Sequence, residues 1–514
     1  MSTSVRTRFA PSPTGYLHVG GIRTALFAYL VARQADGQFI LRLEDTDQKR
    51  EVEGSADHLV ECLQTLGITY DEGPDKPGDF GPYKQSERLD IYKAWAQKLI
   101  DAGRAYADPY TPDEVQAFRE QAQKEKKPFL YRNNRPSQEL RTTSRPEDWY
   151  GRYPLRFKSD PKAYEWHDEV MGDLKTGPEV VDDIILIKSD GFPTYNFAHI
   201  VDDAEMQISH VIRGQEFLAS MPNYLNIYEA LGLERPIFAT MPHILNEQGN
   251  KKLGKRDGAK DVLDYVREGF LPDALVSFIA TLGWNDGTEQ EIFTRQELIE
   301  KFSLDRVGRS GAHFDQRRLL WTNGHFIREL PLDKLYELVS CHPELAGDEL
   351  VESDSGSNRE LDSRLRGNDE LGFWPAAAAN SDEAYQKQVL SLVQERMKYL
   401  AELPELTSFF FEEPVPNPEL ISTNKQLKKL DRAELQDILK LSADELAKTD
   451  FTPEAIQNCL NALLQTTTYK PSTLFSLIRI ATTWAPASPE LAPSLAVLGR
   501  DRVLTRIQTA LDIL

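Results

Sequence analysis

The sequence predicts an α/β fold with a parallel sheet near the N-terminus, followed by a second half made of helices. A strand, a loop, a helix and a second strand follow one another within residues 5–43, which is the order of a βαβ unit with parallel strands. From residue 331 onward the pattern is almost exclusively helical. A chain of 514 residues is also long enough for about three or four domains.

The elements of the βαβ unit can be assigned in order. Apolar and polar residues alternate over residues 5–9, which predicts a short strand, and the two prolines and the glycine of residues 10–15 predict a loop. Apolar residues at 22, 26, 29 and 30 predict an amphipathic helix, and residues 39–43 predict the second strand. Ligands of parallel sheets bind at the carboxyl ends of the strands. The side chains expected at that edge are Arg8, Ser12, His18 and Glu44.

The rest of the chain is assigned by its residue pattern. Residues from about 85 to 185 are mixed in character and predict an insertion into the first domain, with a helix over residues 91–102. Strand-like runs return at 183–187 and 208–212 and continue to 243–245, and helical spacing begins near residue 260. Residues 347–372 are polar and without a period, which predicts a flexible insertion or linker. Trp284 and Trp321 are expected to be core or packing aromatics and not platforms on which bases stack.

The composition excludes several classes of protein. No run of about 20 apolar residues is present, so no membrane-spanning helix is expected, and residues 1–9 are too polar for a secretory signal. Cys62, Cys341 and Cys459 are too few and too far apart for a disulfide scaffold, which favours a reducing cytoplasm. The 60 Lys and Arg against 81 Asp and Glu give a net charge of −21, divided almost evenly between residues 1–330 and 331–514. Such a charge does not favour a nucleic-acid partner.

The first motif with a chemical meaning, His18-Val19-Gly20-Gly21, lies between the first strand and the helix. A helix that begins here directs unpaired N–H groups and the positive end of its dipole at an anion, and the glycines allow a close approach. His18 adds a side-chain donor near the same phosphate. The motif therefore indicates a nucleotide site, although a glycine turn with a surface histidine explains the same four residues when they are taken alone.

The second motif is a basic segment with two glycines, Lys251-Lys252-Leu253-Gly254-Lys255-Arg256-Asp257-Gly258. A basic loop of this type can close on a triphosphate, because the compact charge of lysine suits a phosphate whose charge shifts during a reaction. Taken alone, a run of this kind is more often a solvated basic surface.

Together, the two motifs resemble the paired signatures of class I aminoacyl-tRNA synthetases. His18-Val19-Gly20-Gly21 corresponds to the HIGH element of that class, and Lys252-Leu253-Gly254-Lys255-Arg256 corresponds to its KMSKS element. Further blocks are similar to the bacterial glutamyl-tRNA synthetase family, namely residues 8–15, 43–47, 193–198, 201–203, 210–214, 314–315 and 498–504. The resemblance covers most of the first 330 residues.

The resemblance implies a Rossmann-type catalytic domain with an inserted acceptor-binding domain, followed by an all-α anticodon-binding half. The implied boundaries are residues 1–84 and 186–250 for the two halves of the catalytic domain, 85–185 for the inserted acceptor-stem-binding domain, 251–330 for a KMSKS-loop and stem-contact domain, and 331–514 for the helical anticodon-binding region with its flexible insertion at 347–372.

The resemblance also implies a reaction, in which ATP activates L-glutamate to glutamyl-adenylate and the glutamyl group passes to the 3′-terminal adenosine of tRNA-Glu. The implied catalytic residues, His18 and Lys255, would stabilise charge on the reacting phosphate. The residues implied at ATP are His18, Gly20, Gly21, Lys252, Leu253, Gly254, Lys255 and Arg256.

The implied glutamate site explains the choice of substrate. Arg8 and Arg213 would face the side-chain carboxylate of glutamate, because arginine only donates hydrogen bonds and a carboxylate only accepts them. The amide NH₂ of glutamine would instead place a second donor against the arginine N–H groups. The residues implied at glutamate are Arg8, Ala10, Ser12, Glu44, Tyr195, His199 and Arg213.

The implied cofactor is ATP with Mg²⁺, and the implied partners are the acceptor stem and the anticodon of tRNA-Glu, bound by a cytoplasmic monomer. Some relatives bind zinc through cysteines of the inserted domain, which has none here, so we expect no zinc. His167, His243 and His313 show no paired ligand spacing, so we expect no other bound metal. Gly254 stands where relatives usually carry serine, which affects the freedom of the loop.

Several alternatives share part of these features. The glutaminyl enzyme has a β-barrel-like anticodon region, a silent tRNA-binding paralogue would lack motif residues, and a nucleotidyl transferase acting without tRNA would not need the helical half. The helices after residue 331 and the complete motifs favour the glutamyl type. Whether tRNA-Gln is also charged stays open at this point.

Overall fold

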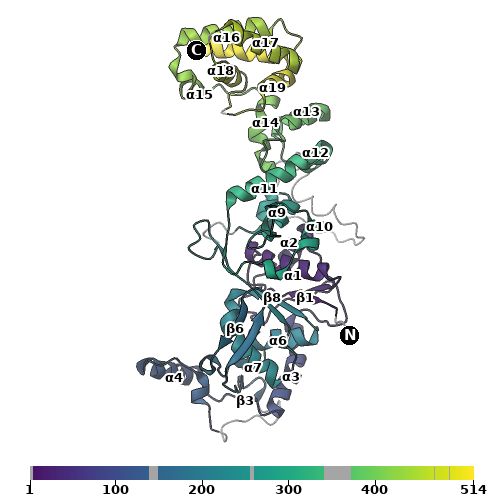
Figure 1. The fold of residues 1–514 in the computed structure, drawn as a ribbon, viewed down its shortest axis with the longest axis vertical. Coiled ribbons are helices and arrows are strands. Elements are labelled where there is room, and N and C mark those ends of the chain that lie inside the picture. Colours follow the sequence, from purple (N-terminus) through teal and green to yellow (C-terminus); the bar gives the residue numbers. More distant parts are fainter. Residues whose placement is uncertain (1–3, 138–148, 255–259, 341–371, 468, 486) are drawn as a thin grey trace. The chain divides into compact units, whose positions relative to one another are not determined.

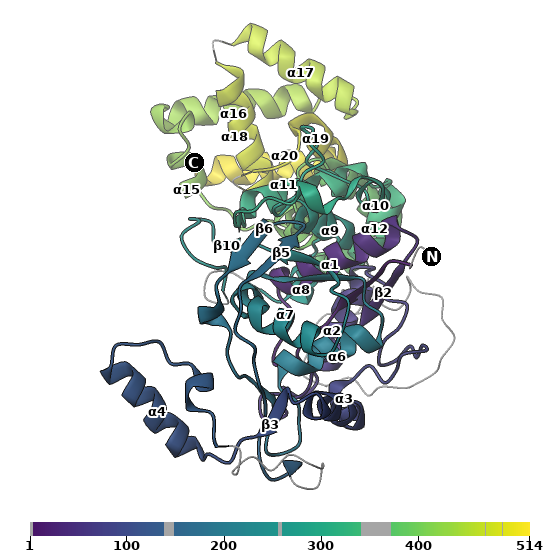
Figure 2. The same ribbon diagram turned by 60° about the horizontal axis from the view of Figure 1, so that its bottom comes forward.

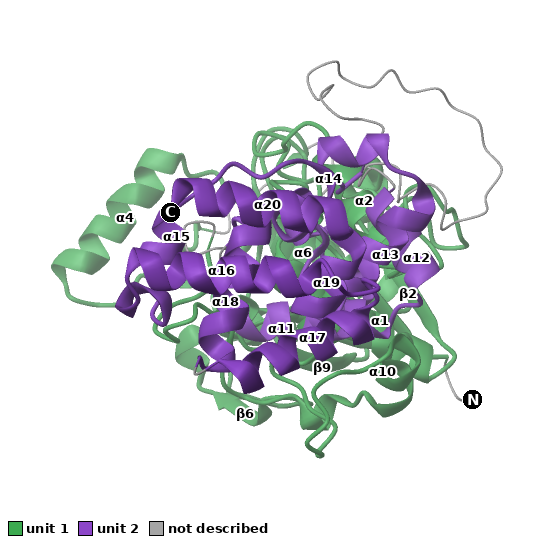
Figure 3. Ribbon diagram, turned by 90° about the horizontal axis from the view of Figure 1, so that it is seen from above, with its two compact units in different colours: residues 1–264, 275–316 green, residues 265–274, 317–514 purple. Residues whose placement is uncertain are grey.

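The computed structural model describes residues 4–137, 149–254, 260–340, 372–467, 469–485 and 487–514. The chain separates into two compact units, which we call the first unit (residues 1–264 and 275–316) and the second unit (residues 265–274 and 317–514) (Figure 3). The predicted insertion at 347–372 lies outside the described residues except for residue 372, and so do Lys255 and Arg256.

The first unit is built on a four-stranded parallel sheet in the order β2-β1-β8-β9. Figure 1 labels its two central strands, β1 and β8. Helix α1 (Val19–Gln34) joins the first two strands, so the predicted βαβ unit and its parallel sheet are confirmed. Ile22, Leu26 and Leu30 of α1 are fully buried, because their helical spacing places them on one face. The strands are β1 (Arg6–Phe9), β2 (Gln38–Leu41), β8 (His210–Gly214) and β9 (Ile237–Met241).

The order of the strands determines where a ligand can bind. Strand β1 lies between β2 and β8. The chain passes from β1 to β2 on one side, and about 170 residues later it adds β8 on the other side, so the direction of strand addition reverses at β1. At such a switch point the loops after neighbouring strands separate and leave a crevice at the carboxyl edge. The loops after Phe9, Leu41 and Gly214 therefore meet at one place.

The residues between 85 and 185 form small sheets of their own. Strands β3 (Ala105–Ala107), β4 (Leu155–Phe157) and β7 (Ile185–Ile187) pair antiparallel, and β5 (Tyr164–Asp168) and β6 (Gly172–Thr176) form a second antiparallel pair. The helix predicted at 91–102 is α3 (Leu89–Asp101). Helix α4 (Pro112–Lys124) buries none of its residues and stands away from the small sheets in Figure 2.

The remaining elements of the first unit surround the parallel sheet. They are α2 (Ser55–Thr65), α6 (Tyr195–Glu205), α7 (Met221–Ala230), α10 (Arg295–Lys301), β10 (Ile244–Leu245) and β11 (Ala312–His313). Helices α8 (Val262–Arg267) and α9 (Pro272–Ala280) contribute residues to both units. Trp284 is buried in the first unit, as expected.

The described part of the second unit contains helices and no strand, in agreement with the predicted all-α half. One buried apolar cluster includes residues of α11, α12 and α13, and another includes residues of α16 to α20. Trp321 of α11 is 49% exposed and therefore does not belong to the core. None of the described helices is both long and apolar enough to cross a membrane. The helices are α11 (Gln316–Glu329), α12 (Leu332–Ser340), α13 (Glu383–Val393), α14 (Leu403–Phe411), α15 (Glu419–Ser422), α16 (Arg432–Leu446), α17 (Pro453–Thr466), α18 (Pro471–Thr483), α19 (Leu491–Leu498) and α20 (Arg500–Ile513).

Candidate active site

A pocket of about 1070 Å³ opens at the carboxyl edge of the parallel sheet, which is enough space for a nucleotide beside an amino acid. His199 and Gly254 do not line it, and Lys255 and Arg256 lie outside the described residues. The predicted site residues that line the pocket are Arg8, Ala10, Ser12, His18, Gly20, Gly21, Glu44, Tyr195, Arg213, Lys252 and Leu253.

The start of helix α1 forms one side of this pocket. His18 is the N-cap of α1, and its Nδ1 accepts a hydrogen bond from the backbone N–H of Gly20 at 3.1 Å. In the neutral ring this bond leaves the proton on Nε2, so that the exposed imidazole can donate to an anion. A Cβ atom on Gly20 would lie 3.0 Å from Cε1 of His18. Glycine at this position therefore keeps the histidine ring in place.

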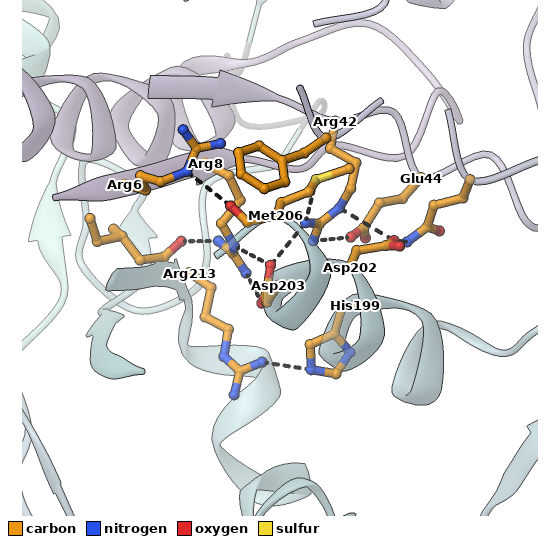
Figure 4. Close-up of polar contacts among 12 residues, drawn as sticks. Arg6, Arg8, Arg42, Glu44, His199, Asp202, Asp203, Met206 and Arg213 are labelled. Atoms are coloured by element: carbon orange, nitrogen blue, oxygen red, sulfur yellow. Dashed lines mark hydrogen bonds and ion pairs between the residues drawn. The ribbon is translucent and has the colours of Figure 1, made fainter. Parts of the chain in front are cut away.

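Arg8 lines the pocket, and a carboxylate from helix α6 neutralises its charge (Figure 4). Its Nε and Nη2 donate to Asp203 at 3.0 and 3.4 Å, and its Nη1 donates to the carbonyl of Ile212 at 3.1 Å. Burial alone would raise the pKa of Asp203, but the charges of Arg8 and then Arg42 outweigh it and hold that pKa below its ordinary value. The positive charge of Arg8 is therefore largely balanced by Asp203, and its main contribution to the pocket is its size and its hydrogen-bond donors.

Arg42 extends this network toward Glu44. It donates to Asp203 at 2.9 Å and to Glu44 at 3.1 Å, and its Nε lies 3.6 Å from Asp202 (Figure 4). Asp202 is paired in turn with Arg88 at 2.7 Å. Each aspartate thus lies between two guanidinium groups, whereas Glu44 has one ion pair among the described residues, with Arg42.

Of the three carboxylates, Glu44 therefore has the fewest cations beside it to offset the cost of burying its charge. It is 4% exposed, and burial raises its pKa to about 7, although the charges of Arg42 and Arg8 oppose the shift. A cation that enters the pocket beside Glu44 would restore the charged form. The α-ammonium of an amino acid is such a cation.

Arg213 is a buried cation of the pocket without an acidic partner among the described residues. It comes from strand β8, is 6% exposed, and has no carboxylate within ion-pair distance among the described residues. The rings of Tyr224, Phe217 and Phe238 lie 5.0, 5.6 and 5.8 Å from its guanidinium carbon. Aromatic faces stabilise such a cation only partly. The arrangement leaves Arg213 able to bind an anion in the pocket.

His199 holds Arg213 without lining the pocket itself. Burial, followed by the charge of Arg213, lowers the pKa of His199 to about 3, so the ring is neutral near pH 7. Its Nδ1 lies 2.7 Å from the carbonyl of Tyr195, which requires the proton on Nδ1. Its Nε2 then accepts from Arg213 at 3.4 Å, and Arg213 also contacts the sulfur of Met221. A fixed tautomer of His199 thus orients the guanidinium.

Sequence reasoning did not assign roles to Arg42, Asp202 and Asp203, which hold Arg8 and Glu44 in position. It also missed Lys188, which lines the pocket and donates to the carbonyl of Thr46 at 3.2 Å. A signal was present for the first three, because Arg42 directly precedes the block at residues 43–47, and the aspartates belong to the block at residues 201–203.

Comparison with known proteins agrees with this architecture. Residues 4–321 match the family described as tRNA synthetases class I (E and Q), catalytic domain, and residues 366–511 match an anticodon binding domain. The glutamate–tRNA ligase of Bacillus licheniformis is 37% identical over the full length of both chains, and that of Geobacillus thermodenitrificans is 38% identical over 99% of each. A crystal structure of a glutamate tRNA ligase from Elizabethkingia meningosepticum, in complex with its amino acid, is 28% identical over 99% of each chain, with a TM-score of 0.80.

The parallel sheet, the histidine-capped helix and the helical anticodon domain define a class I tRNA synthetase. Within that class, the chain belongs to the family whose catalytic domain is that of the glutamate and glutamine enzymes. The resemblance noted from the motifs is thereby confirmed, and so is the predicted fold class.

Proposed function

We infer that this chain is a glutamate–tRNA ligase, an aminoacyl-tRNA synthetase that consumes ATP. The observation that carries this conclusion is the match of the entire chain, both units included, to relatives named glutamate–tRNA ligase at 37 to 38% identity. The pocket supports the same function, because it combines the start of helix α1, which suits a phosphate, with the guanidinium of Arg213, which has no carboxylate partner in the described part of the chain.

In the first step an oxygen of the glutamate α-carboxylate attacks the α-phosphorus of ATP. The new oxygen–phosphorus bond gives glutamyl-adenylate, and the bond to the bridging oxygen breaks so that pyrophosphate leaves. His18 donates from Nε2 toward the phosphate oxygens at the start of α1, and Lys255 with Lys252 neutralises the departing charge. Mg²⁺ enters with ATP as part of the substrate and needs no separate set of protein ligands.

In the second step a ribose hydroxyl of the terminal adenosine attacks the activated carbonyl carbon. The ester bond to tRNA forms, the hydroxyl proton is released, and the bond between the carbonyl carbon and the phosphate oxygen breaks so that AMP leaves. The protein contributes mainly by holding the reacting groups in line.

The choice of glutamate follows from the two ends of the amino-acid site. Glu44 would bind the α-ammonium, and Arg213 would bind the side-chain carboxylate, with Arg8 and the Tyr195 hydroxyl beside it. Glutamine would place its NH₂ against the N–H groups of Arg213. Such a mismatch leaves buried donors unpaired, which is the situation that gives strong rejection of a wrong substrate.

The test is aminoacylation of purified tRNA-Glu and tRNA-Gln with labelled glutamate, together with ATP–pyrophosphate exchange. We expect charging of tRNA-Glu, exchange that depends on glutamate and on tRNA, and a loss of about 100-fold or more in Lys255→Ala. Lys301→Ala removes a lysine of α10 outside the pocket and serves as the matched control. Charging of tRNA-Gln as well would show a wider tRNA range, whereas exchange with glutamine and not with glutamate would overturn the assignment.

A further inference from the structure

A cluster of three potential metal ligands lies in the first unit, outside the residues assigned to substrates. His58 and Cys62 are one turn apart on helix α2, so their side chains share a face. Asp261 joins them from the segment that precedes helix α8, 199 residues after Cys62. The histidine nitrogen, the cysteine sulfur and a carboxylate oxygen all lie within 4.8 Å of one another.

The individual distances show how compact the cluster is. Nε2 of His58 lies 2.6 Å from Oδ2 of Asp261. Sγ of Cys62 lies 3.7 and 3.8 Å from the two ring nitrogens of His58 and 4.0 Å from Oδ1 of Asp261. Cys62 is fully buried, and the side chains of His58 and Asp261 are 11% and 12% exposed. The ligand atoms therefore meet in a space that is shielded from solvent but close to it.

Backbone contacts fix the third ligand independently of the other two. Asp261 forms an isolated bridge with His18, and the N–H of Val262 donates to the carbonyl of Leu17 at 3.3 Å. The same carboxylate accepts from the N–H of Leu263 at 3.1 Å, which orients it at the start of α8. The position of Asp261 opposite α2 is thus set by the fold and does not depend on its ion pair with His58.

The three donors define a class of cation. Thiolate, imidazole and carboxylate together suit Zn²⁺ or Co²⁺, whereas Mg²⁺ and Ca²⁺ prefer oxygen ligands alone. Tetrahedral bonds of about 2.3 Å to sulfur and about 2.0–2.2 Å to nitrogen and oxygen place sulfur about 3.5 Å from the other two donors. The distances from Cys62 are within about 0.5 Å of that value. Only the distance between Nε2 of His58 and Oδ2 of Asp261 must increase, by somewhat less than about 1 Å, to accommodate the ion.

We propose that His58, Cys62 and Asp261 form a binding site for a divalent transition-metal ion of the zinc and cobalt type, with water as the fourth ligand. The ion takes the place of the hydrogen bond between His58 and Asp261, so the imidazole proton moves from Nε2 to Nδ1, and the Cys62 thiol loses its proton to solvent when its sulfur bonds to the metal. The bound ion ties helix α2 to the segment that bridges His18. Its action is therefore to stabilise this side of the active site, and no step of the reaction passes through it.

This inference differs from the expectation that the chain binds no metal. That expectation rests on the absence of cysteines from the inserted region and on the lack of paired ligand spacing at His167, His243 and His313, so it considers only ligands that lie close together in the sequence. His58 and Cys62 alone are two donors at helical spacing, which is too few for a site. The third donor becomes visible only when the fold brings residue 261 next to α2.

The test is a titration of the full-length, chelator-treated protein with Co²⁺, followed by absorption. We expect one equivalent to bind with a thiolate-to-cobalt charge-transfer band and with the visible bands of a tetrahedral ion, and Zn²⁺ should displace both. Cys62→Ser should lose the charge-transfer band. Cys459→Ser, which removes a half-buried cysteine of α17, is the matched control and should keep the band.

A second measurement guards against loss of folding in the cysteine variant. Zn²⁺ should raise the melting temperature of the wild type, and the Co²⁺ affinity of His58→Gln and Asp261→Asn should fall by about 10-fold or more, with unchanged circular dichroism. Absence of a charge-transfer band in the wild type would overturn the proposal. A band that persists in Cys62→Ser would also overturn it, because another cysteine would then be the ligand.

Discussion

Arg8 and Arg213 illustrate how two residues of one type acquire different roles from their neighbours. Both are buried and line the same pocket, but Arg8 is paired with Asp203 at 3.0 Å, whereas Arg213 has aromatic rings and the neutral His199 around it. A carboxylate that enters the pocket gains more from the cation that has no acidic partner. We therefore assign the main contact with the glutamate side chain to Arg213.

Arg213→Lys tests this assignment. Lysine keeps the charge but cannot form two parallel hydrogen bonds with a carboxylate. Loss of a charged hydrogen bond costs about 1.5–3 kcal/mol, so kcat/KM for glutamate should fall roughly 10- to 100-fold, while KM for ATP stays within about twofold. Steady-state aminoacylation measures both values. Arg33→Lys is the control, because Arg33 lies in a partly exposed ion pair with Asp71 outside the pocket. A loss of equal size in kcat/KM for ATP would contradict the assignment.

Glu44 predicts how glutamate binding depends on pH. Burial raises its pKa to about 7, and an ammonium group beside it would lower that pKa, so binding at pH 7 should release about half a proton per molecule. Affinity for glutamate should therefore rise as the pH increases from about 6 to 8, before the amino acid itself loses its charge. Calorimetry in two buffers of different ionisation enthalpy measures the released protons, and identical heats in both would contradict the prediction.

The same shift has a defined sign for stability. The pKa of Glu44 in the folded chain lies above the ordinary value of 4.5, so the folded state holds more protons than the unfolded state between about pH 4.5 and 7. The contribution of Glu44 to the free energy of unfolding therefore falls as the pH rises through that range. Glu44→Gln removes the titrating group and should abolish both this contribution and the release of protons on binding.

At the scale of elements, the first turn of α1 combines a structural and a chemical task. The backbone N–H of Gly20 donates to Nδ1 of His18, so the proton of the neutral ring lies on Nε2, the nitrogen that would donate to a phosphate. The pairing of β1 with β2 and β8 places this turn at the edge where the crevice opens. The element thus depends on a small residue beside the cap and on the order of the strands.

Gly20→Ala separates these two tasks. Alanine favours a helix over glycine by about 0.5–1 kcal/mol, so the melting temperature should stay equal or rise slightly. The added Cβ would press on Cε1 of His18 at 3.0 Å and turn the ring, so pyrophosphate exchange should fall by about 10-fold or more. Thermal unfolding and exchange kinetics on the same sample give both results. Parallel losses of stability and rate would instead indicate general damage to the helix.

At the scale of the whole molecule, the sequence predicts whatever depends on local spacing. The parallel βαβ unit, helix α3 and the positions of Arg8, His18 and Glu44 at one edge all follow from patterns within about 45 residues. The pair formed by Arg42 and Asp203 joins residues 161 positions apart, so no local pattern contains it. Trp321 has helical spacing, but spacing alone does not tell whether another element covers that face.

The same distinction applies to the sheets. Residues 185–187 form a strand, as their apolar run predicts, but β7 pairs with β4 in the small antiparallel sheet. A short apolar run suits either sheet, because pairing depends on partners elsewhere in the chain. The sequence therefore predicts that a strand is present better than it predicts which other strands pair with it.

The net charge of −21 gives the last prediction, because a chain that binds tRNA must still neutralise phosphates. If basic residues gather on one face while acidic residues occupy the rest, the number of neutralised phosphates stays small. For about four to six contacts, the logarithm of the tRNA association constant should fall against the logarithm of salt with a slope of about −3 to −5. Filter binding at a series of salt concentrations measures this slope. A slope near zero would contradict phosphate contacts altogether, and a slope of about −10 would show a basic surface far larger than the composition favours.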